Sequence, residues 1–124
     1  MNNITYAKRL LENYSVNKAA RENYPHEMIM INSRLYSSCA ENTVVEMIHA
    51  KDLLTLRTEK ALREIQKTER ALEGLSEYEK DLLSAFYITR IHSGAEAIAG
   101  RYSVERSTVY RDKNKALRKF AESI

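Results

Sequence analysis

Residues that interrupt helices are scarce in this chain, and their scarcity narrows the folds that it can adopt. The 124 residues include three glycines and one proline, and the consecutive residues 43–73 contain neither. A turn-rich β-fold needs many such residues, whereas long helices need few. The sequence therefore predicts an all-α fold in which residues 43–73 form one helix of about 45 Å, at roughly 1.5 Å per residue.

The N-terminal part is expected to contain two helices. Apolar spacing indicates a first helix over about 4–22 and a second over about 26–37. We expect a break at Pro25, because the residue before a proline is disfavoured in a helix. The composition of residues 37–42 is typical of a linker, which contains the single cysteine, Cys39.

The long helix has signals at both ends and an apolar stripe along it. Thr43 and Glu46 match a capping box at its start, and Gly74 is suited to end it. The stripe consists of Met47, Leu54, Thr58, Ala61, Ile65 and Leu72. Because Lys51 and Thr58 interrupt this stripe, two uses stay open: pairing with a second copy of the chain as a homodimer, or packing against the N-terminal helices.

The final part of the chain is expected to form shorter helices. A capping box of Ser76 and Glu79 starts the first of them, which runs to about Thr89. A second box, Ser93 with Glu96, starts the next helix. These signals predict two helices that precede the last one.

A tight turn at 102–104 then leads to a last helix over about 105–121, in the pattern of a helix-turn-helix. Ala99 supplies the small side chain needed where two such helices cross. Ser103 stands where this turn normally has glycine, which is tolerable if its backbone is not strongly left-handed. The positions expected to be buried in the last helix are Val109, Ala116, Leu117 and Phe120.

Polar and basic side chains alternate with these buried positions. The outward positions that can contact base edges or phosphates are Arg106, Ser107, Tyr110, Arg111 and Asn114. Positive charge continues along a phosphate track at Lys113, Lys115, Arg118 and Lys119. From Arg90 onward, eight basic and four acidic residues leave +4, and the rest of the chain carries −1 within the net +3. This asymmetry predicts binding to double-stranded DNA; the alternative is a helical hairpin with a charged, solvated face.

Residues 75–120 resemble the region 4 domain of bacterial sigma factors. The shared entry is Leu-Ser-x-x-Glu-x-x-Leu-Leu at 75–83, and the shared close is an Ala-Leu-Arg-Lys-apolar run at 116–120. The order of N-terminal helices, a Tyr-Pro break, a long charged helix and this domain is similar to the RinA- and ArpU-type regulators of phages of Gram-positive bacteria. The resemblance implies a sequence-specific DNA-binding transcriptional regulator of phage or prophage origin, with RNA polymerase as a further partner.

The resemblance also implies a division of the chain, and two positions depart from it. The parts are an N-terminal helical segment 1–42, a long charged helix 43–74 and a C-terminal helix-turn-helix domain 75–124. Glu105 stands where Ser or Thr normally caps the recognition helix, and Ser103 could substitute. Asp112 stands where an aliphatic residue is normally buried, so either the helix phase shifts or Asp112 is exposed.

Other chemistry lacks support in the sequence. His26, His49 and His92 are far apart and lack companion ligands at metal-binding spacing, and no glycine-rich phosphate loop or hydrolase nucleophile turn occurs. We therefore expect no enzyme, no metal and no cofactor. A single cysteine provides no internal disulfide and fits a reducing, cytoplasmic setting. No apolar run approaches the roughly 20 residues that span a bilayer, so we expect no membrane partner.

Two other functions stay open. A small terminase-like DNA-packaging protein also combines a helix-turn-helix with long assembling helices, although its usual order puts DNA binding first. A protein adaptor would use the same fold to bind RNA polymerase instead of DNA. Assembly size and retention of DNA at low salt would separate both from a regulator.

Overall fold

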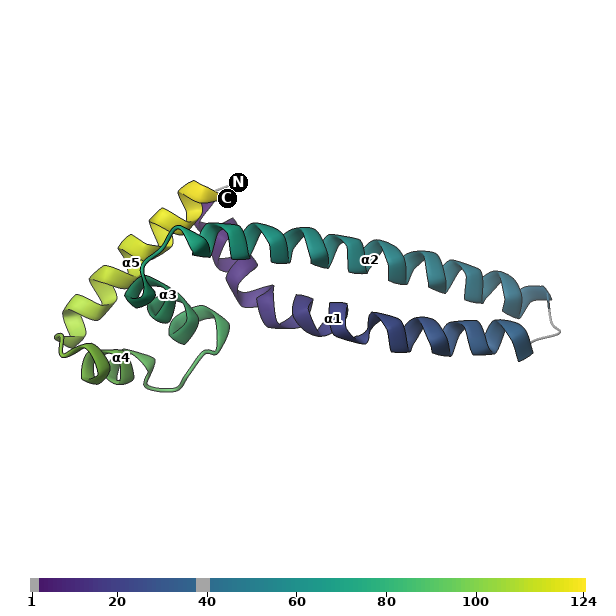
Figure 1. The fold of residues 1–124 in the computed structure, drawn as a ribbon, viewed down its shortest axis with the longest axis horizontal. Helices are drawn as coiled ribbons and strands as arrows, with labels where there is room; N and C mark the ends of the chain where they lie inside the picture. The colour runs from purple at the N-terminus through teal and green to yellow at the C-terminus, as the bar shows by residue number, and fades with distance from the viewer. Residues whose placement is uncertain (1–2, 38–40) are drawn as a thin grey trace. The chain divides into compact units, whose positions relative to one another are not determined.

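Helices make up all the regular structure that can be described in this chain (Figure 1). The computed structural model describes residues 3–37 and 41–124, and the expected all-α class is confirmed there. The elements are α1 (Asn3–Ser37), α2 (Glu41–Glu73), α3 (Glu77–Leu83), the π-helix η1 (Ser84–Ile88), α4 (Gly94–Tyr102) and α5 (Arg106–Ser123). None of these helices has both the length and the apolar character needed to cross a membrane.

The chain divides into two compact units. The C-terminal unit joins the start of α1, up to Ser15, to residues 65–124, and the hairpin unit comprises residues 16–64. Within the hairpin unit, α1 and α2 run antiparallel and side by side (Figure 1). The Asn17 amide donates to the Glu64 carboxylate at 2.8 Å across this pair. The long helix thus packs against the N-terminal helix, one of the two uses that the sequence left open.

The predicted break at Pro25 is wrong, because α1 continues through it as one helix. A proline inside a helix removes one backbone hydrogen bond and costs about 3 kcal/mol. Pro25 itself is exposed, while Tyr24, Met28 and Leu35 continue one half-buried stripe across it. The packing of that stripe in the hairpin unit outweighs the local preference for a break.

The start of α2 also differs from the prediction. The helix includes Glu41, two residues before the predicted start, so the capping box of Thr43 and Glu46 is wrong. The predicted linker is helical at both its ends, and its Cys39 lies outside the described residues. At the far end the helix stops before Gly74, as predicted.

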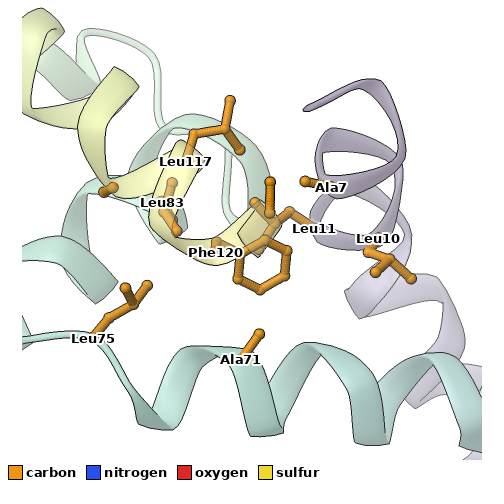
Figure 2. Packing of buried hydrophobic residues seen from close by; sticks show 10 residues of the cluster. Ala7, Leu10, Leu11, Ala71, Leu75, Leu83, Leu117 and Phe120 are labelled. Atoms are coloured by element: carbon orange, nitrogen blue, oxygen red, sulfur yellow. The ribbon is translucent and has the colours of Figure 1, made fainter. Parts of the chain in front are cut away.

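An apolar core holds the C-terminal unit together (Figure 2). The fully buried ring of Phe120 points from α5 into the space beside Leu11 of α1 and Ala71 of α2 (Figure 2). The core cluster comprises Ala7, Leu10, Leu11, Ala71, Leu75, Leu83, Ala116, Leu117, Phe120 and Ala121. The four positions expected to be buried in the last helix, Val109, Ala116, Leu117 and Phe120, are all confirmed.

A second cluster fixes α4 against its neighbours in the same unit. Its buried members are Leu82, Ala85, Ala95, Ile98 and Val109. The Tyr102 hydroxyl donates to the Asp81 carboxylate, and the Arg101 guanidinium lies 3.3 Å from the same carboxylate. These contacts tie α3, η1, α4 and α5 into one frame, which buries one side of α5.

Candidate nucleic-acid interface

The exposed side of α5 carries polar residues in one line. Ser107, Arg111, Asn114 and Arg118 follow the i, i+4, i+7, i+11 spacing of a single helix face, and all four are exposed. Lys115 is exposed beside them. We call these five residues the α5 stripe. Because the core holds the opposite side of α5, the helix cannot rotate to cover the stripe.

The cations of the α5 stripe have no acidic partner in the part of the chain that the structure describes. No ion pair there involves Arg111, Lys115 or Arg118. The Arg111 guanidinium makes one long contact, 3.5 Å, with the Thr108 hydroxyl, which is too long to hold the side chain firmly. The stripe therefore presents unneutralised positive charge on a rigid helix.

Three predicted contact residues lie apart from the stripe, in a cluster of cations and aromatic rings beside η1. Arg106 pairs with Glu96 at 3.1 Å, and its guanidinium lies 5.8 Å from the centre of the Tyr110 ring. The Tyr110 ring meets Phe86 edge-on at 5.6 Å, and the Lys113 amine lies 5.0 Å from the centre of the Phe86 ring. Burial lowers the pKa of Lys113. The structure thus brings together five of the nine predicted residues and places three others in a flanking cluster. The ninth, Lys119, pairs with Glu79 of α3.

Sequence reasoning missed the π-helix η1, which supplies Phe86 to this cluster. The Thr89 N–H donates to the Ser84 carbonyl at 2.8 Å, five residues back, and Arg90 then adopts a left-handed φ of 51°. Such π-helical turns often occur at functional sites. The adjacent aromatic residues Phe86 and Tyr87 were the available signal for an irregular turn. A search for 3.6-residue periodicity does not reveal the extra residue that a π-helical turn contains.

The start of α4 also differs from the prediction. Ser93 is left-handed, with φ 62°, and makes no side-chain cap, so the capping box with Glu96 is wrong. The next residue, Gly94, lies so close to η1 that a Cβ would sit 3.4 Å from the Ala85 carbonyl oxygen. An open pocket of about 540 Å³ lies beside Gly94 and Ala85. Its lining includes Arg90, His92, Glu96, Arg106 and Tyr110.

The turn between α4 and α5 is strained. Ser103 has φ 55° and ψ 46°, and the Val104 N–H donates to the Ala99 carbonyl at 3.1 Å. Glycine is the usual residue in this arrangement, and another residue costs about 1–2 kcal/mol there. The condition under which serine was expected to be tolerable is therefore not met. Glu105 precedes α5 in an extended conformation, and α5 has no side-chain cap, so Ser103 does not replace one.

Two polar contacts attach α5 to α3. The predicted box of Ser76 and Glu79 is confirmed, with both hydrogen bonds present. The Ser76 N–H donates to the Glu79 carboxylate, and this hydrogen bond is the main cause that lowers the pKa of Glu79. The Lys119 amine, 3.0 Å from the same carboxylate, lowers it further. Asp112 is half-buried and accepts from the Tyr78 hydroxyl at 2.8 Å. Both predicted alternatives for Asp112 are therefore wrong: the residue is not exposed, and the buried side of α5 is the one predicted. Asp112 makes a hydrogen bond to α3 where an apolar contact was expected.

Neither metal chemistry nor a known relative adds information about this surface. Within the two described ranges, no group of three or more His, Cys, Asp or Glu side chains could hold a metal ion. Comparison with protein-family models, curated proteins and solved structures gives no match to this chain. The function must therefore be argued from the residues themselves.

Proposed function

We propose that this chain is a helix-turn-helix transcriptional regulator of the kind found in phages, and that it binds double-stranded DNA sequence-specifically through α5. The observation that carries the proposal is the α5 stripe, whose three exposed cations have no acidic partner among the described residues, on a helix whose other side is buried. An α-helix fits the major groove of B-DNA, and arginine and asparagine there read guanine and adenine edges.

The proposed roles follow from position along α5. Ser107, Arg111 and Asn114 lie toward its N-terminal half, which in such docking contacts base edges. Lys115 and Arg118 lie further along and contact phosphates. These two contacts add affinity that falls steeply with salt.

The flanking cluster has a different proposed role. Arg106, Tyr110 and Lys113 border the stripe, and Arg106 is already paired with Glu96. Both partners of that pair are largely exposed, at 64% and 50% of their side-chain surface, so solvent screens the attraction between them. Arg106 can therefore exchange Glu96 for a phosphate, while Tyr110 and Lys113 keep α5 against η1.

The test is DNA binding by the full chain, with duplexes selected from a random-sequence pool and affinities measured by fluorescence anisotropy. Arg111→Ala should lower the affinity for the selected duplex by about tenfold to a hundredfold and relax the sequence preference at one base position. Arg118→Ala should lower the affinity for all duplexes by a similar factor. It should also reduce the slope of log affinity against log salt concentration by about one. Arg63→Ala on the exposed side of α2 is the matched control and should change neither.

Four outcomes would overturn the proposal. Selection could return no preferred sequence, or Arg111→Ala could bind as tightly as the unchanged chain. Retention of RNA polymerase without any DNA binding at low salt would favour the adaptor. A ring of eight or more subunits that binds DNA without affecting transcription would favour the packaging protein.

A further inference from the structure

The hairpin unit exposes an unusual amount of apolar surface. Nine of the eleven large hydrophobic side chains that are exposed in the described ranges belong to it: Val16, Ile29, Met30, Tyr36, Val45, Ile48, Leu53, Leu56 and Leu62. Within residues 16–37 and 41–64, only Leu54, Thr58 and Ala61 are buried. Two helices alone cannot enclose a core, because each keeps one side of its apolar surface uncovered.

One face of the hairpin unit is hollowed into a groove of about 360 Å³. Its lining residues are Glu27, Met30, Ile31, Arg34, Ala50, Leu53, Leu54 and Arg57. Met30 and Leu53 are 49% and 44% exposed, so apolar side chains lie open to solvent in the groove. Charges of both signs flank this apolar centre.

The charges of the groove are arranged in a self-complementary way along α1. Glu27 and Arg34 are seven residues apart, about 10 Å along a helix, and Met30 and Ile31 lie midway between them. A two-fold axis through this midpoint would oppose Glu27 of one copy to Arg34 of the other, twice, with apolar residues in contact at the centre. Neither charge is in an ion pair within the described ranges, so both are available.

We infer that the groove of the hairpin unit binds a second copy of this chain, in an antiparallel, two-fold dimer centred on Met30 and Ile31. An interface of this kind uses the same patch on both subunits, and must therefore be complementary to itself. Pairing converts two thin hairpins into a four-helix arrangement, in which each helix gains a further apolar neighbour. The symmetric placement of Glu27 and Arg34 on α1 matches a second copy, while the third charge of the groove, Arg57, lies on α2.

The test is the oligomeric state of the full chain, measured by light scattering after size-exclusion chromatography and by analytical ultracentrifugation over a range of concentrations. The unchanged chain should be a dimer. Glu27→Arg should weaken it, because both of its cross-pairs become repulsive, and Arg34→Glu should do the same. Two exposed pairs changed from attraction to repulsion correspond to roughly a tenfold to hundredfold rise in the dimer dissociation constant.

A mixture of the two charge variants separates this interface from any other. Glu27→Arg mixed with Arg34→Glu restores opposite charges at both cross-pairs, so the heterodimer should form although each variant alone dissociates. The matched control is Glu22→Arg, a charge reversal at an exposed position of α1 outside the groove, which should leave the dimer intact. Circular dichroism confirms that each variant keeps its helix content.

The oligomeric state is measured without DNA, so the absence of a dimer would not by itself contradict the proposed DNA binding. A monomer at all concentrations would overturn it, as would a dimer that both charge variants leave unchanged. Failure of the mixed variants to associate would also overturn the two-fold arrangement. A larger assembly that persists when Met30→Glu is introduced would show that another face joins the copies.

Discussion

The C-terminal unit and the hairpin unit bury their apolar side chains to very different extents. Of the eighteen buried hydrophobic residues in the described ranges, sixteen belong to the C-terminal unit and two, Leu54 and Ala61, to the hairpin unit. Most of the exposed large hydrophobic residues belong to the hairpin unit. Because α1 and α2 run through both units, the same helices are well packed at one end and poorly packed at the other.

This contrast shows that helix formation and core formation are separate properties of a sequence. The scarcity of glycine and proline permits long helices everywhere, but a core needs at least one more layer. In the C-terminal unit α3 and α5 provide that layer, whereas the described part of the hairpin unit consists of α1 and α2 alone. Stability should therefore respond to core substitutions in one unit far more than in the other.

The largest expected effect is that of Phe120→Ala in the C-terminal core. Removal of a fully buried ring should lower the free energy of unfolding by about 3–5 kcal/mol, because the lost contacts leave a cavity. Leu54→Ala in the hairpin unit should cost only about 2 kcal/mol, since a thin layer can close over the gap. Urea denaturation followed by circular dichroism measures both. Equal losses would show that the two units are packed equally well.

The next effect is a gain in the hairpin unit from Pro25→Ala. Pro25 is exposed inside α1, so its replacement restores a backbone hydrogen bond without disturbing a core and should stabilise the hairpin by up to about 3 kcal/mol. Thermal unfolding followed by circular dichroism checks this. Asn23→Ala, at another exposed position of α1, is the control and should gain roughly 0.5 kcal/mol. No gain from Pro25→Ala would mean that the missing backbone hydrogen bond at Pro25 does not destabilise the hairpin.

Pro25 also shows where sequence reasoning fails in this chain. The all-α class, the end of α2 at Gly74 and the box at Ser76 were predictable, because each depends on local spacing or on one hydrogen-bonded turn. The continuation of α1 was not, because it depends on an apolar stripe that packs against α2, far along the chain. A local rule was overridden by a long-range contact.

The candidate interface was predictable in part for the same reason. Period-3.6 spacing places Arg111, Asn114 and Arg118 opposite the buried residues of α5, and they are exposed. The same spacing could not separate Arg106 and Lys113 from them, because their positions depend on Glu96 and on rings that η1 supplies. These tertiary pairs leave no local signal in the sequence, and the adjacent Phe86 and Tyr87 do not by themselves reveal the π-helix.

A smaller effect should follow from the Tyr78–Asp112 hydrogen bond, which joins α3 to α5 in the C-terminal unit. Tyr78→Phe leaves the half-buried Asp112 carboxylate without this donor and should cost about 1–2 kcal/mol at neutral pH. Tyr24→Phe in the hairpin unit is the control and should cost less, since the Tyr24 hydroxyl has no hydrogen-bond partner in the described ranges.

The same bond predicts a dependence on pH. Burial first, and then the Asp112 carboxylate, raises the pKa of Tyr78 from 10.0 to about 12. A group whose pKa is higher in the folded state stabilises that state fully below the unfolded pKa. Its contribution should thus be present below pH 10 and be lost as the pH rises toward 12. Denaturant titrations across this range should show the gap between the chain and Tyr78→Phe shrinking; a constant gap would contradict the shift.

The smallest effect should come from Ser103→Gly, in the strained turn of the otherwise well-packed C-terminal unit. Glycine adopts the left-handed conformation seen there without a steric penalty, so the substitution should stabilise the unit by about 1 kcal/mol. Part of this gain is offset because glycine also frees the unfolded chain. Ser103→Ala keeps the Cβ and loses only the hydroxyl, so it should bring no gain. A gain from alanine equal to that from glycine would place the strain in the side chain rather than in the backbone.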